Sequence, residues 1–424
     1  MLDLKFIRDN KEIVKEAINN RGYKLDIDEF LNLDEEHRKI LVEVEDLRAQ
    51  RNKANDEVAT ILKAKGNPKE IIAKMKPMSQ KISDFEAKVE EISQKIDKIK
   101  YIIPNLPDKS LPVGGPECNK IVKSWGKTPN LGFKAKTHIE LAEILDIICF
   151  GIGAKITGSN FILYKGLGAR LERALINFML DLHTKKHGYT EILPPFLVNR
   201  RSMTGTGQLP KLEDDMYRLK DEDLFLIPTA EVPVTNIHAG DTLEESQLPI
   251  KYAAYSACFR REAGSYGKDT RGLVRIHQFD KVELVKFTKP ETSFDELEKL
   301  LLDAEEVLQL LELPYRVVML ATGDISFAAA KCYDIELYAA GVDTYLEVSS
   351  CSCFTDFQAR RANIRYRDKA TKKTLFLHTL NGSGVALPRL VVAIMENYQN
   401  EDGSIRIPKA LIPYMDGLEV IKPK

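Results

Sequence analysis

Two runs of apolar residues between positions 34 and 100 constrain this chain more than any other feature. Members of each run recur every three or four residues, which is the spacing of a coiled-coil seam. Gly66-Asn67-Pro68 separates the runs and is a strong helix breaker. The pattern predicts one antiparallel helical hairpin over about 34–100, with its tip near 66–68. The two seams mirror each other about position 68, with 61 facing 75, 58 facing 78, 54 facing 82, 51 facing 85, 47 facing 89, 44 facing 92 and 40 facing 96.

The tip of this predicted hairpin is basic. Helices of about 30 residues would give an arm on the order of 45 Å long, and Pro77 is expected to kink the returning helix. A charge run is often only a solvated face, and a coiled coil is often a dimerisation device. A hairpin closes its seam within one chain, so a projecting basic tip favours a polyanion such as RNA, although the other two interpretations stay open. Between 63 and 76 there is one acid, Glu70, against five lysines, Lys63, Lys65, Lys69, Lys74 and Lys76.

Composition excludes several classes of protein. The net charge of −1 means that any nucleic-acid binding must depend on a local patch. The N-terminus is charged and has no apolar core of a signal peptide, and no run is long enough for a membrane helix. Six scattered cysteines fit reduced thiols, so we expect a cytoplasmic protein with no membrane partner.

Two short patterns could suggest a metal, and we interpret both as ordinary. Cys351 and Cys353 are one residue apart and lack a partner pair, whereas zinc sites use a spacing of two, so no structural zinc is expected. His183 and His187 lie four apart on a predicted helix, but no glutamate follows the first histidine. We expect both to be surface histidines near a helix end.

The length of 424 residues allows two or three domains. A proline- and glycine-rich stretch follows the hairpin, so we expect an arm domain at 1–103, a linker at 104–118 and a second domain at 119–424. Strands in the second domain follow one another with few intervening helices. This order predicts an α+β fold, with an antiparallel sheet flanked by helices. Helices are expected at 168–188, 293–311 and 385–399, and strands at 189–195, 223–231, 251–262, 273–287 and 344–350.

The segment FRREAGSYGKDTRGL, residues 259–273, carries basic side chains on a glycine-spaced loop. It fails the phosphate-binding P-loop pattern, because Glu262 stands where the first glycine should be and Asp269 where serine or threonine should be. Gly151–Gly158 likewise misses the dinucleotide-binding spacing. Four basic residues nevertheless suggest an anionic ligand: Arg260, Arg261, Lys268 and Arg271.

The strand expected after this loop places chemistry on one face. The period of two puts Phe279, Lys281 and Glu283 together, opposite Val282 and Leu284, with successive members of the face about 7 Å apart. An aromatic ring and an acid on a sheet face are also compatible with simple packing. The preceding strand would add Arg260 at its end, beside Cys258 and Ser256.

The hairpin and five strings that follow it in order make this chain resemble the bacterial seryl-tRNA synthetases, a class II aminoacyl-tRNA synthetase family, over essentially its whole length. Besides the hairpin, the resemblance rests on HGYTEILPP like motif 1, IPTAE at 227–231, FRREAGSYGKDTRGLVRIHQFDKVEL like motif 2, YLEVSSCS, and NGSGVALPRLVVAIMENYQ like motif 3. The sequence departs from the family pattern at Leu346, Cys353 and Pro388, and Pro388 matters most because it fixes φ next to Arg389.

The resemblance implies site roles. Arg260, Arg389 and Glu347 would act in catalysis, with Arg260 holding both the ATP α-phosphate and the serine carboxylate. Glu347 and Ser350 would hold Mg²⁺. The L-serine site would comprise Thr229, Ala230, Glu231, Arg260, Glu283, Asn381 and Ser383. The ATP site would comprise Arg260, Arg261, Glu262, Arg271, Ile276, Phe279, Glu347, Val348, Ser349, Ser350 and Arg389, with Glu262 on the adenine amino group and Phe279 stacked on the ring.

The implied activity is ATP-dependent activation of L-serine and its transfer to tRNA(Ser), and to tRNA(Sec) where the host has it. ATP is a substrate and Mg²⁺ a cofactor in this reaction. The family also implies a homodimer through motif 1, with each arm gripping tRNA bound to the partner's active site. Two alternatives are a synthetase-like paralogue that does not charge tRNA, as a regulator or a carrier-protein ligase, and a coiled-coil adaptor with an inert head.

Overall fold

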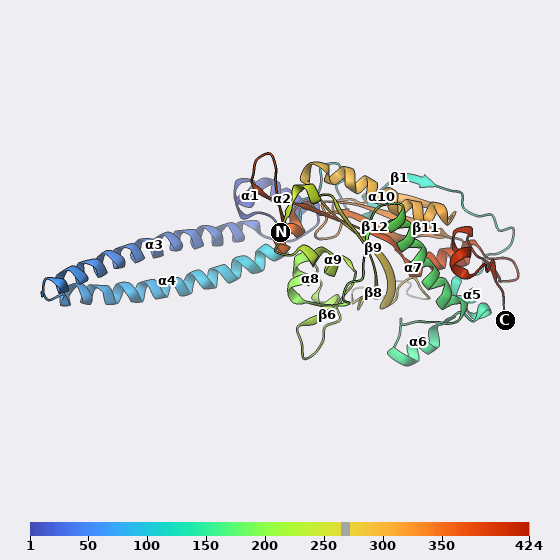
Figure 1. Cartoon of the computed structure of the whole chain (residues 1–424), viewed down its shortest axis with the longest axis horizontal. Helices are drawn as coiled ribbons and strands as arrows, with labels where there is room; N and C mark the ends of the chain where they lie inside the picture. Colours follow the sequence, from blue (N-terminus) through green and yellow to red (C-terminus); the bar gives the residue numbers. More distant parts are fainter. Residues whose placement is uncertain (264–271, 424) are drawn as a thin grey trace. The chain divides into compact units, whose positions relative to one another are not determined.

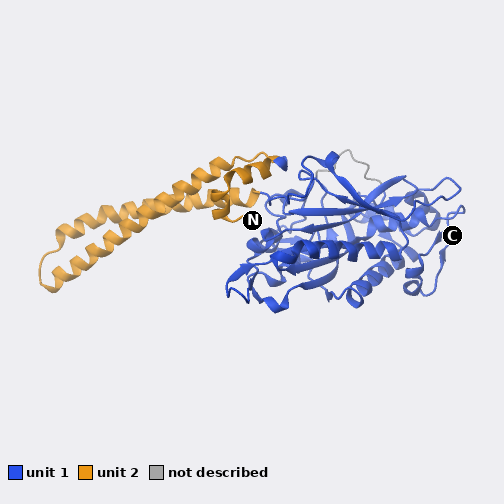
Figure 2. Ribbon diagram, turned by 90° about the horizontal axis from the view of Figure 1, so that it is seen from above, with its two compact units in different colours: residues 1, 20–22, 104–424 blue, residues 2–19, 23–103 orange. Residues whose placement is uncertain are grey.

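The computed structural model describes residues 1–263 and 272–423. The chain forms two compact units, shown in different colours in Figure 2. The hairpin unit comprises residues 2–19 and 23–103, and the sheet unit comprises residues 1, 20–22 and 104–424.

The hairpin unit contains the predicted antiparallel helices, α3 (Ile27–Lys63) and α4 (Lys69–Ile102), which lie side by side along their length (Figure 1). The seam is confirmed: Ile40, Val44, Ile82, Ile92 and Ile96 are buried, and the seam positions nearer the tip are half-buried between exposed neighbours. The reversal near 66–68 is also confirmed, since α3 ends at Lys63 and α4 begins at Lys69.

Polar pairs fix the register of the two helices. His37 Nε2 lies 2.8 Å from Ser93 Oγ, and Arg48 Nη2 lies 2.6 Å from Glu86 Oε1. α3 begins earlier than expected, because the Asp26 side chain accepts from the backbone N–H of Asp28 and supplies an N-cap. Pro77 does not divide the returning helix, since α4 is a single helix through that position. Two short helices precede the hairpin, α1 (Leu4–Asp9) and α2 (Lys11–Asn20).

The sheet unit is built on eight strands in the order β1-β10-β11-β12-β15-β9-β8-β4. All neighbours are antiparallel except β4 and β8, which confirms the predicted antiparallel sheet. The strands are β1 (Lys120–Trp125), β4 (Thr190–Ile192), β8 (Ile250–Phe259), β9 (Gln278–Thr288), β10 (Tyr315–Met319), β11 (Lys331–Ala339), β12 (Thr344–Cys353) and β15 (His378–Ala386).

Three amphipathic helices pack on this sheet: α7 (Leu167–Lys185), α10 (Ser293–Leu310) and α12 (Leu387–Asn397). Figure 1 labels α7 and α10. Their apolar faces join Val282 and Leu284 of β9 in one large buried cluster. The other helices of the described ranges are α5 (His138–Leu145), α6 (Phe150–Thr157), α8 (Arg200–Thr206), α9 (Glu231–Thr235) and α11 (Phe357–Ala362). The remaining strands pair in small sheets: β2 (Ile148–Cys149) with β3 (Leu163–Tyr164), β5 (Leu197–Asn199) with β6 (Leu224–Leu226), β7 (Thr242–Glu244) with β13 (Arg365–Arg367) and β14 (Thr374–Phe376), and β16 (Ile405–Arg406) with β17 (Val420–Ile421).

Several expectations differ from the structure in detail. The strand expected over 273–287 begins only at Gln278, because residues 273–277 form turns and bends. The strands β10, β11 and β15 were not predicted, although β15 lies between β12 and β9 in the centre of the sheet. The segment expected as a linker at 104–118 is packed in part, since the Asn105 side chain is buried and donates to the carbonyls of Ala328 and Phe354.

Candidate active site

A cavity of about 470 Å³ lies in the sheet unit, over residues of β9, β12 and β15. Most of the predicted site residues line it, although they come from segments far apart in the chain. The predicted residues that line the cavity are Thr229, Glu231, Arg260, Glu262, Ile276, Phe279, Glu283, Glu347, Val348, Ser349, Ser350, Asn381, Ser383 and Arg389.

Two predicted residues are not among those that line the cavity, and a third lies outside the described residues. Ala230 is buried in an apolar cluster and is not among the lining residues. The Arg261 guanidinium donates to the carbonyl of Asp214 at 3.0 Å and is also absent from the lining. Arg271 lies outside the described residues, as does Lys268 of the same basic loop.

One end of the cavity holds a buried cation between polar acceptors. Lys281 forms an ion pair with Glu283, and its Nζ donates to Thr229 Oγ1 at 2.8 Å. The Thr229 hydroxyl in turn lies 3.2 Å from Glu283 Oε2. The Lys281 and Glu283 side chains are 7% and 1% exposed, so each charge is compensated by the other rather than by water.

Glu231 is a second buried carboxylate at the same end. It is the first residue of α9, and its Oε1 accepts from Gln358 Nε2 at 2.7 Å. Burial, followed by the negative charge of Glu283, raises the pKa of Glu231 to about 7. Glu231 is therefore a carboxyl that titrates near neutral pH, unlike an ordinary glutamate.

Arg260 follows β8 and lies over the aromatic face supplied by β9. Its guanidinium carbon is 5.2 Å from the centroid of the Phe279 ring, and its Nε donates to the carbonyl of Pro228 at 3.3 Å. The backbone N–H of Arg260 donates to the carbonyl of His277, which joins the end of β8 to the start of β9. The predicted grouping of a ring, an acid and a guanidinium on one sheet face is thus present.

Glu262 faces a cation that was not predicted. The Glu262 backbone has φ of +52°, a left-handed conformation that is uncommon for glutamate. Its Oε2 accepts from Arg275 Nη1 at 2.5 Å. Glu262 was expected to accept from an adenine amino group. In the structure its carboxylate already accepts from Arg275.

Arg389 lies at the first turn of α12 and reaches two segments. Its Nε donates to the carbonyl of Val274 at 3.2 Å, its Nη1 donates to the carbonyl of Glu347 at 2.6 Å, and the same Nη1 lies 3.5 Å from Glu347 Oε2. Pro388 falls within the first two positions of α12, where a missing N–H breaks no helical bond. Pro388 is therefore compatible with the observed aim of Arg389.

Hydroxyl groups of β12 complete the cavity wall. Ser349 Oγ donates to the carbonyl of Ser383 at 2.7 Å, which ties β12 to β15. Ser350 Oγ lies 3.1 Å from Cys332 Sγ. Within residues 1–263 and 272–423, no group of three or more His, Cys, Asp or Glu side chains could hold a metal ion. Glu347, half-exposed beside Ser350, still offers the one or two oxygens that Mg²⁺ takes from proteins when phosphates supply others.

The expectation of two surface histidines is wrong. His183 is fully buried, and its Nδ1 lies 3.0 Å from Nδ1 of His187, whose Nε2 lies 2.9 Å from Glu306 Oε2. Burial lowers the pKa of His183 to about 3. The helix α7 turns this side chain towards the sheet, which a spacing of four residues could not reveal. The cysteines agree with expectation, since all six are free thiols.

Lys281, Arg275 and Gln358 are among the residues at the site to which sequence reasoning gave no role. Lys281 carried a usable signal, because the period of two already placed it between Phe279 and Glu283. Gln358 and Arg275 carried none, since they reach Glu231 and Glu262 only through tertiary packing.

Two family profiles match the chain. The seryl-tRNA synthetase N-terminal domain matches residues 1–107, and the tRNA synthetase class II core domain (G, H, P, S and T) matches residues 213–398. No helix within the described ranges is long and apolar enough to cross a membrane.

Curated relatives match the chain from end to end. The serine–tRNA ligase of Pelobacter propionicus is 55% identical over 423 residues, covering 100% of both chains. The serine–tRNA ligase of Trichlorobacter lovleyi is 57% identical over 422 residues, covering 99% of this chain and 100% of the relative. Among solved structures, seryl-tRNA synthetase from Pyrococcus horikoshii complexed with ATP superposes with a TM-score of 0.93 at 41% identity, covering 100% of both chains. The chain therefore belongs to the seryl-tRNA synthetase family, the class II serine–tRNA ligases.

Proposed function

We propose that this chain activates L-serine with ATP and transfers the seryl group to the 3′ end of tRNA(Ser). One observation carries the proposal: the cavity unites an arginine over an aromatic ring with an end lined by two carboxylates. Arg260 and Phe279 suit a ligand in which a phosphate is joined to a planar base. The two carboxylates, Glu231 and Glu283, suit a ligand with an ammonium group and a hydroxyl. The serine–tRNA ligase relatives share this chain's full length.

The chemistry needs positioning rather than a protein nucleophile. The serine carboxylate attacks the α-phosphorus of ATP, pyrophosphate leaves, and seryl-adenylate remains. Arg260 holds both anions, since a guanidinium fork can serve two acceptors and neutralise charge as they meet. The 3′-terminal ribose hydroxyl of tRNA then attacks the seryl carbonyl and displaces AMP. Catalysis is orientation plus electrostatic stabilisation of the phosphoryl transition state.

The nucleotide lies over β9 and β12 in this proposal. Phe279 stacks on the adenine ring, and Ile276, Val348 and Ser349 line its surroundings. Glu262 accepts from the adenine amino group while it remains paired with Arg275. The outer phosphates lie near Arg389, with Arg271 and Arg261 as further candidate phosphate contacts from the motif 2 segment.

The acidic end receives the amino acid. Glu231 and Glu283 attract the ammonium group, while Thr229, Asn381 and Ser383 supply polar contacts, with the Ala230 backbone beside them. Lys281 holds Glu283 in place through their ion pair. The negative charge of Glu283 is therefore compensated by the ammonium of Lys281. Alanine in place of serine would leave buried acceptors unpaired, at about 1–3 kcal/mol for each.

Glu347 and Ser350 are the residues proposed to hold Mg²⁺. A divalent cation there would neutralise the phosphate charge and favour departure of pyrophosphate. Arg389 contacts the backbone and carboxylate of Glu347, so it keeps that carboxylate near the phosphate end of the cavity.

The hairpin unit is proposed to bind tRNA. Its lysine-rich tip suits the phosphate backbone, and a long helical rod suits recognition by shape. We extend the proposal to a homodimer through motif 1, with each arm serving the partner's active site, and to tRNA(Sec) in hosts that have it. The free thiols suit a reducing compartment such as the cytoplasm.

The test is ATP–pyrophosphate exchange dependent on L-serine, followed by charging of tRNA(Ser). Arg260→Ala is expected to abolish exchange, because no other residue in the proposal joins the two anions, while circular dichroism and melting stay near those of the parent protein. Exchange with another amino acid but not serine would overturn the substrate assignment. Near-normal exchange by Arg260→Ala would overturn the role of that residue, and exchange without charging would indicate the non-charging paralogue.

A further inference from the structure

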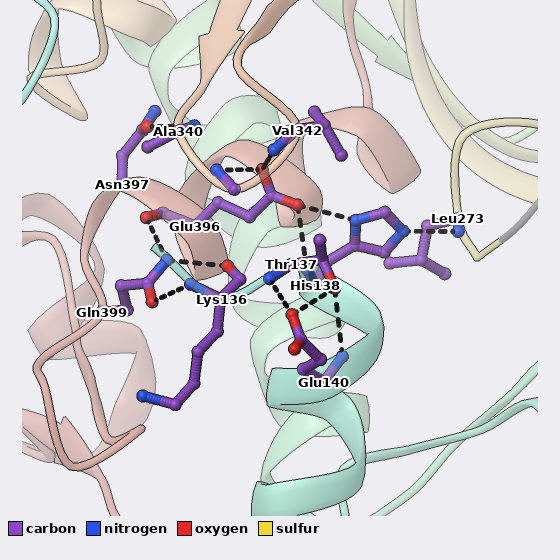
Figure 3. A network of polar contacts seen from close by, with 11 residues as sticks. Lys136, Thr137, His138, Glu140, Leu273, Ala340, Val342, Glu396, Asn397 and Gln399 are labelled. Carbon is purple, nitrogen blue, oxygen red and sulfur yellow. Dashed lines mark hydrogen bonds and ion pairs between the residues drawn. The ribbon is translucent and has the colours of Figure 1, made fainter. Parts of the chain in front are cut away.

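A buried carboxylate at the end of α12 organises four donors from two other segments (Figure 3). Glu396 has no exposed surface. One oxygen accepts from the backbone N–H of His138 and from its Nδ1, both at 2.8 Å. The other oxygen accepts from the backbone N–H groups of Gly341 and Val342, at 2.8 and 3.1 Å. The bonds satisfy a carboxylate that would otherwise be costly to bury.

The contacts of His138 determine its tautomer. The Nε2 atom lies 3.2 Å from the backbone nitrogen of Leu273, and a backbone N–H can only donate. Nε2 must therefore be unprotonated, and the single ring proton of the neutral imidazole lies on Nδ1, where it is donated to Glu396. The carboxylate thus orients a ring whose acceptor atom faces Leu273 (Figure 3).

The segment that begins at Gly272 is pressed tightly against this ring. Gly272 has φ of +69°, and a Cβ added there would lie 2.1 Å from His138 Nε2. Both the conformation and the space require glycine. His138 and Leu273 are themselves buried, so neither can yield by moving into solvent.

The same segment supplies the phosphate end of the candidate active site. Leu273, Val274 and Ile276 line the cavity, and the carbonyl of Val274 accepts from Arg389 Nε. Arg389 lies at the start of α12 and Glu396 near its end, so this helix is linked to residues 272–276 at both ends. A shift at Leu273 would move the neighbouring carbonyl of Val274, which accepts from Arg389 and so fixes the orientation of its side chain.

We propose that His138, oriented by Glu396, is a positioning residue for the nucleotide, acting through Leu273 and Val274 on Arg389. This inference rests on the proposed nucleotide role of Arg389. It assigns a function in the reaction to a side chain that does not line the cavity. The serine end, built from other segments, should be insensitive to it.

Two substitutions separate the two ring contacts. His138→Asn keeps a donor near the Nδ1 position for Glu396 but leaves the N–H of Leu273 without an acceptor. His138→Gln keeps an acceptor near the Nε2 position for Leu273 but removes the donor to Glu396.

In serine-dependent ATP–pyrophosphate exchange, His138→Asn is expected to raise the KM for ATP about five- to tenfold, which corresponds to the loss of one buried hydrogen bond, while the KM for serine stays unchanged. His138→Gln is expected to lower the melting temperature more and to keep the KM for ATP within about twofold, since an amide oxygen replaces Nε2 as the acceptor.

Glu140→Ala is the matched control, because Glu140 caps the same helix through Thr137, and its contacts in Figure 3 do not extend to Leu273. It should lower the melting temperature without changing the KM for ATP. Two results would overturn the proposal. One is that the KM for ATP changes in step with the melting temperature across all three variants, and the other is that His138→Asn does not change the KM for ATP. Arg389→Ala serves as the reference: if it leaves the KM for ATP unchanged, the proposed phosphate role fails, whereas a rise with Arg389→Ala alone refutes only the role of His138.

Discussion

At the scale of single residues, Glu231 and Glu283 differ although both are buried carboxylates at the serine end. Glu283 pairs directly with the ammonium of Lys281. Glu231 has the neutral amide of Gln358 as its close partner and also senses the charge of Glu283. Burial, followed by the negative charge of Glu283, raises the pKa of Glu231 to about 7, so Glu231 responds to pH near neutrality.

Binding of serine is therefore expected to strengthen as pH rises from about 6 to about 8. The pKa of Glu231 is raised to about 7, so its carboxylate, which is proposed to attract the ammonium group of serine, forms in this range. The KM for serine in the exchange assay should fall across that range, and Glu231→Gln should have a higher KM with little dependence on pH. A parent protein with a flat profile, or a variant that keeps the slope, would contradict the assignment to Glu231.

The stability of the apoprotein should change in the opposite direction. The folded pKa of Glu231 lies above its ordinary value of 4.5, so the folded state holds this proton more tightly than the unfolded state does. The stability contributed by this proton is fully present below pH 4.5 and is lost as pH rises through about 7. The ionised form of Glu231, which is the form proposed to bind serine, is thus the one that stabilises the fold less.

At the scale of elements, the irregular end of β15 is where the sheet meets the active site. The register with β9 shifts between Ser383 and Val385, and Val385 has φ of +128°, an unusual backbone for a β-branched residue. Gly384 lies between them, and a Cβ added there would lie 2.8 Å from His183 Nε2 and 3.2 Å from Val282 Cγ1. The irregularity places Ser383 at the cavity, and His183 packs against Gly384 beside it.

Gly384→Ala is expected to destabilise the fold by about 1–3 kcal/mol, the cost of overpacking, and to raise the KM for serine more than that for ATP. His183 cannot move away easily because its other nitrogen bonds to His187. Urea unfolding and exchange kinetics would measure the two effects. Gly151→Ala is the control, since a Cβ at Gly151 meets nothing within 4 Å. Equal, small effects from both substitutions would show that the space at Gly384 does not matter.

At the scale of the whole molecule, two units carry different parts of the proposed function. In the proposed function, serine activation needs only the cavity of the sheet unit, whereas charging also needs tRNA held by the hairpin unit. The two reactions should therefore be separable by changing one unit.

Deletion of residues 40–99, with the ends joined by a short glycine link, is expected to abolish charging of tRNA(Ser) while exchange stays within about twofold of the parent rate, because the cavity residues are untouched. A variant of the full chain with alanine at the five tip lysines should bind tRNA with a weaker salt dependence, its slope falling by about 0.7–0.9 for each phosphate that is no longer neutralised. If exchange and charging fall together in the deletion, the arm is not a separate tRNA-binding device.

The amino-acid sequence by itself determined the hairpin, because a seam within one chain depends on local periodicity and one breaker, and both are visible without long-range contacts. It also determined the face formed by Phe279, Lys281 and Glu283, since a strand alternates with a period of two. The motif strings pointed to the family, and most of the site residues that they implied line the cavity.

Only the tertiary structure decided which of these residues are paired with one another. The partners of Glu231 and Glu262 come from other segments of the chain, Gln358 is on α11, and no local pattern encodes that proximity. The same holds for His183, buried beside Gly384, and for His138, whose acceptor atom is set by Glu396 at the far end of the chain. Periodicity records the face on which a residue lies, whereas charge compensation and tautomer depend on what packs against that face.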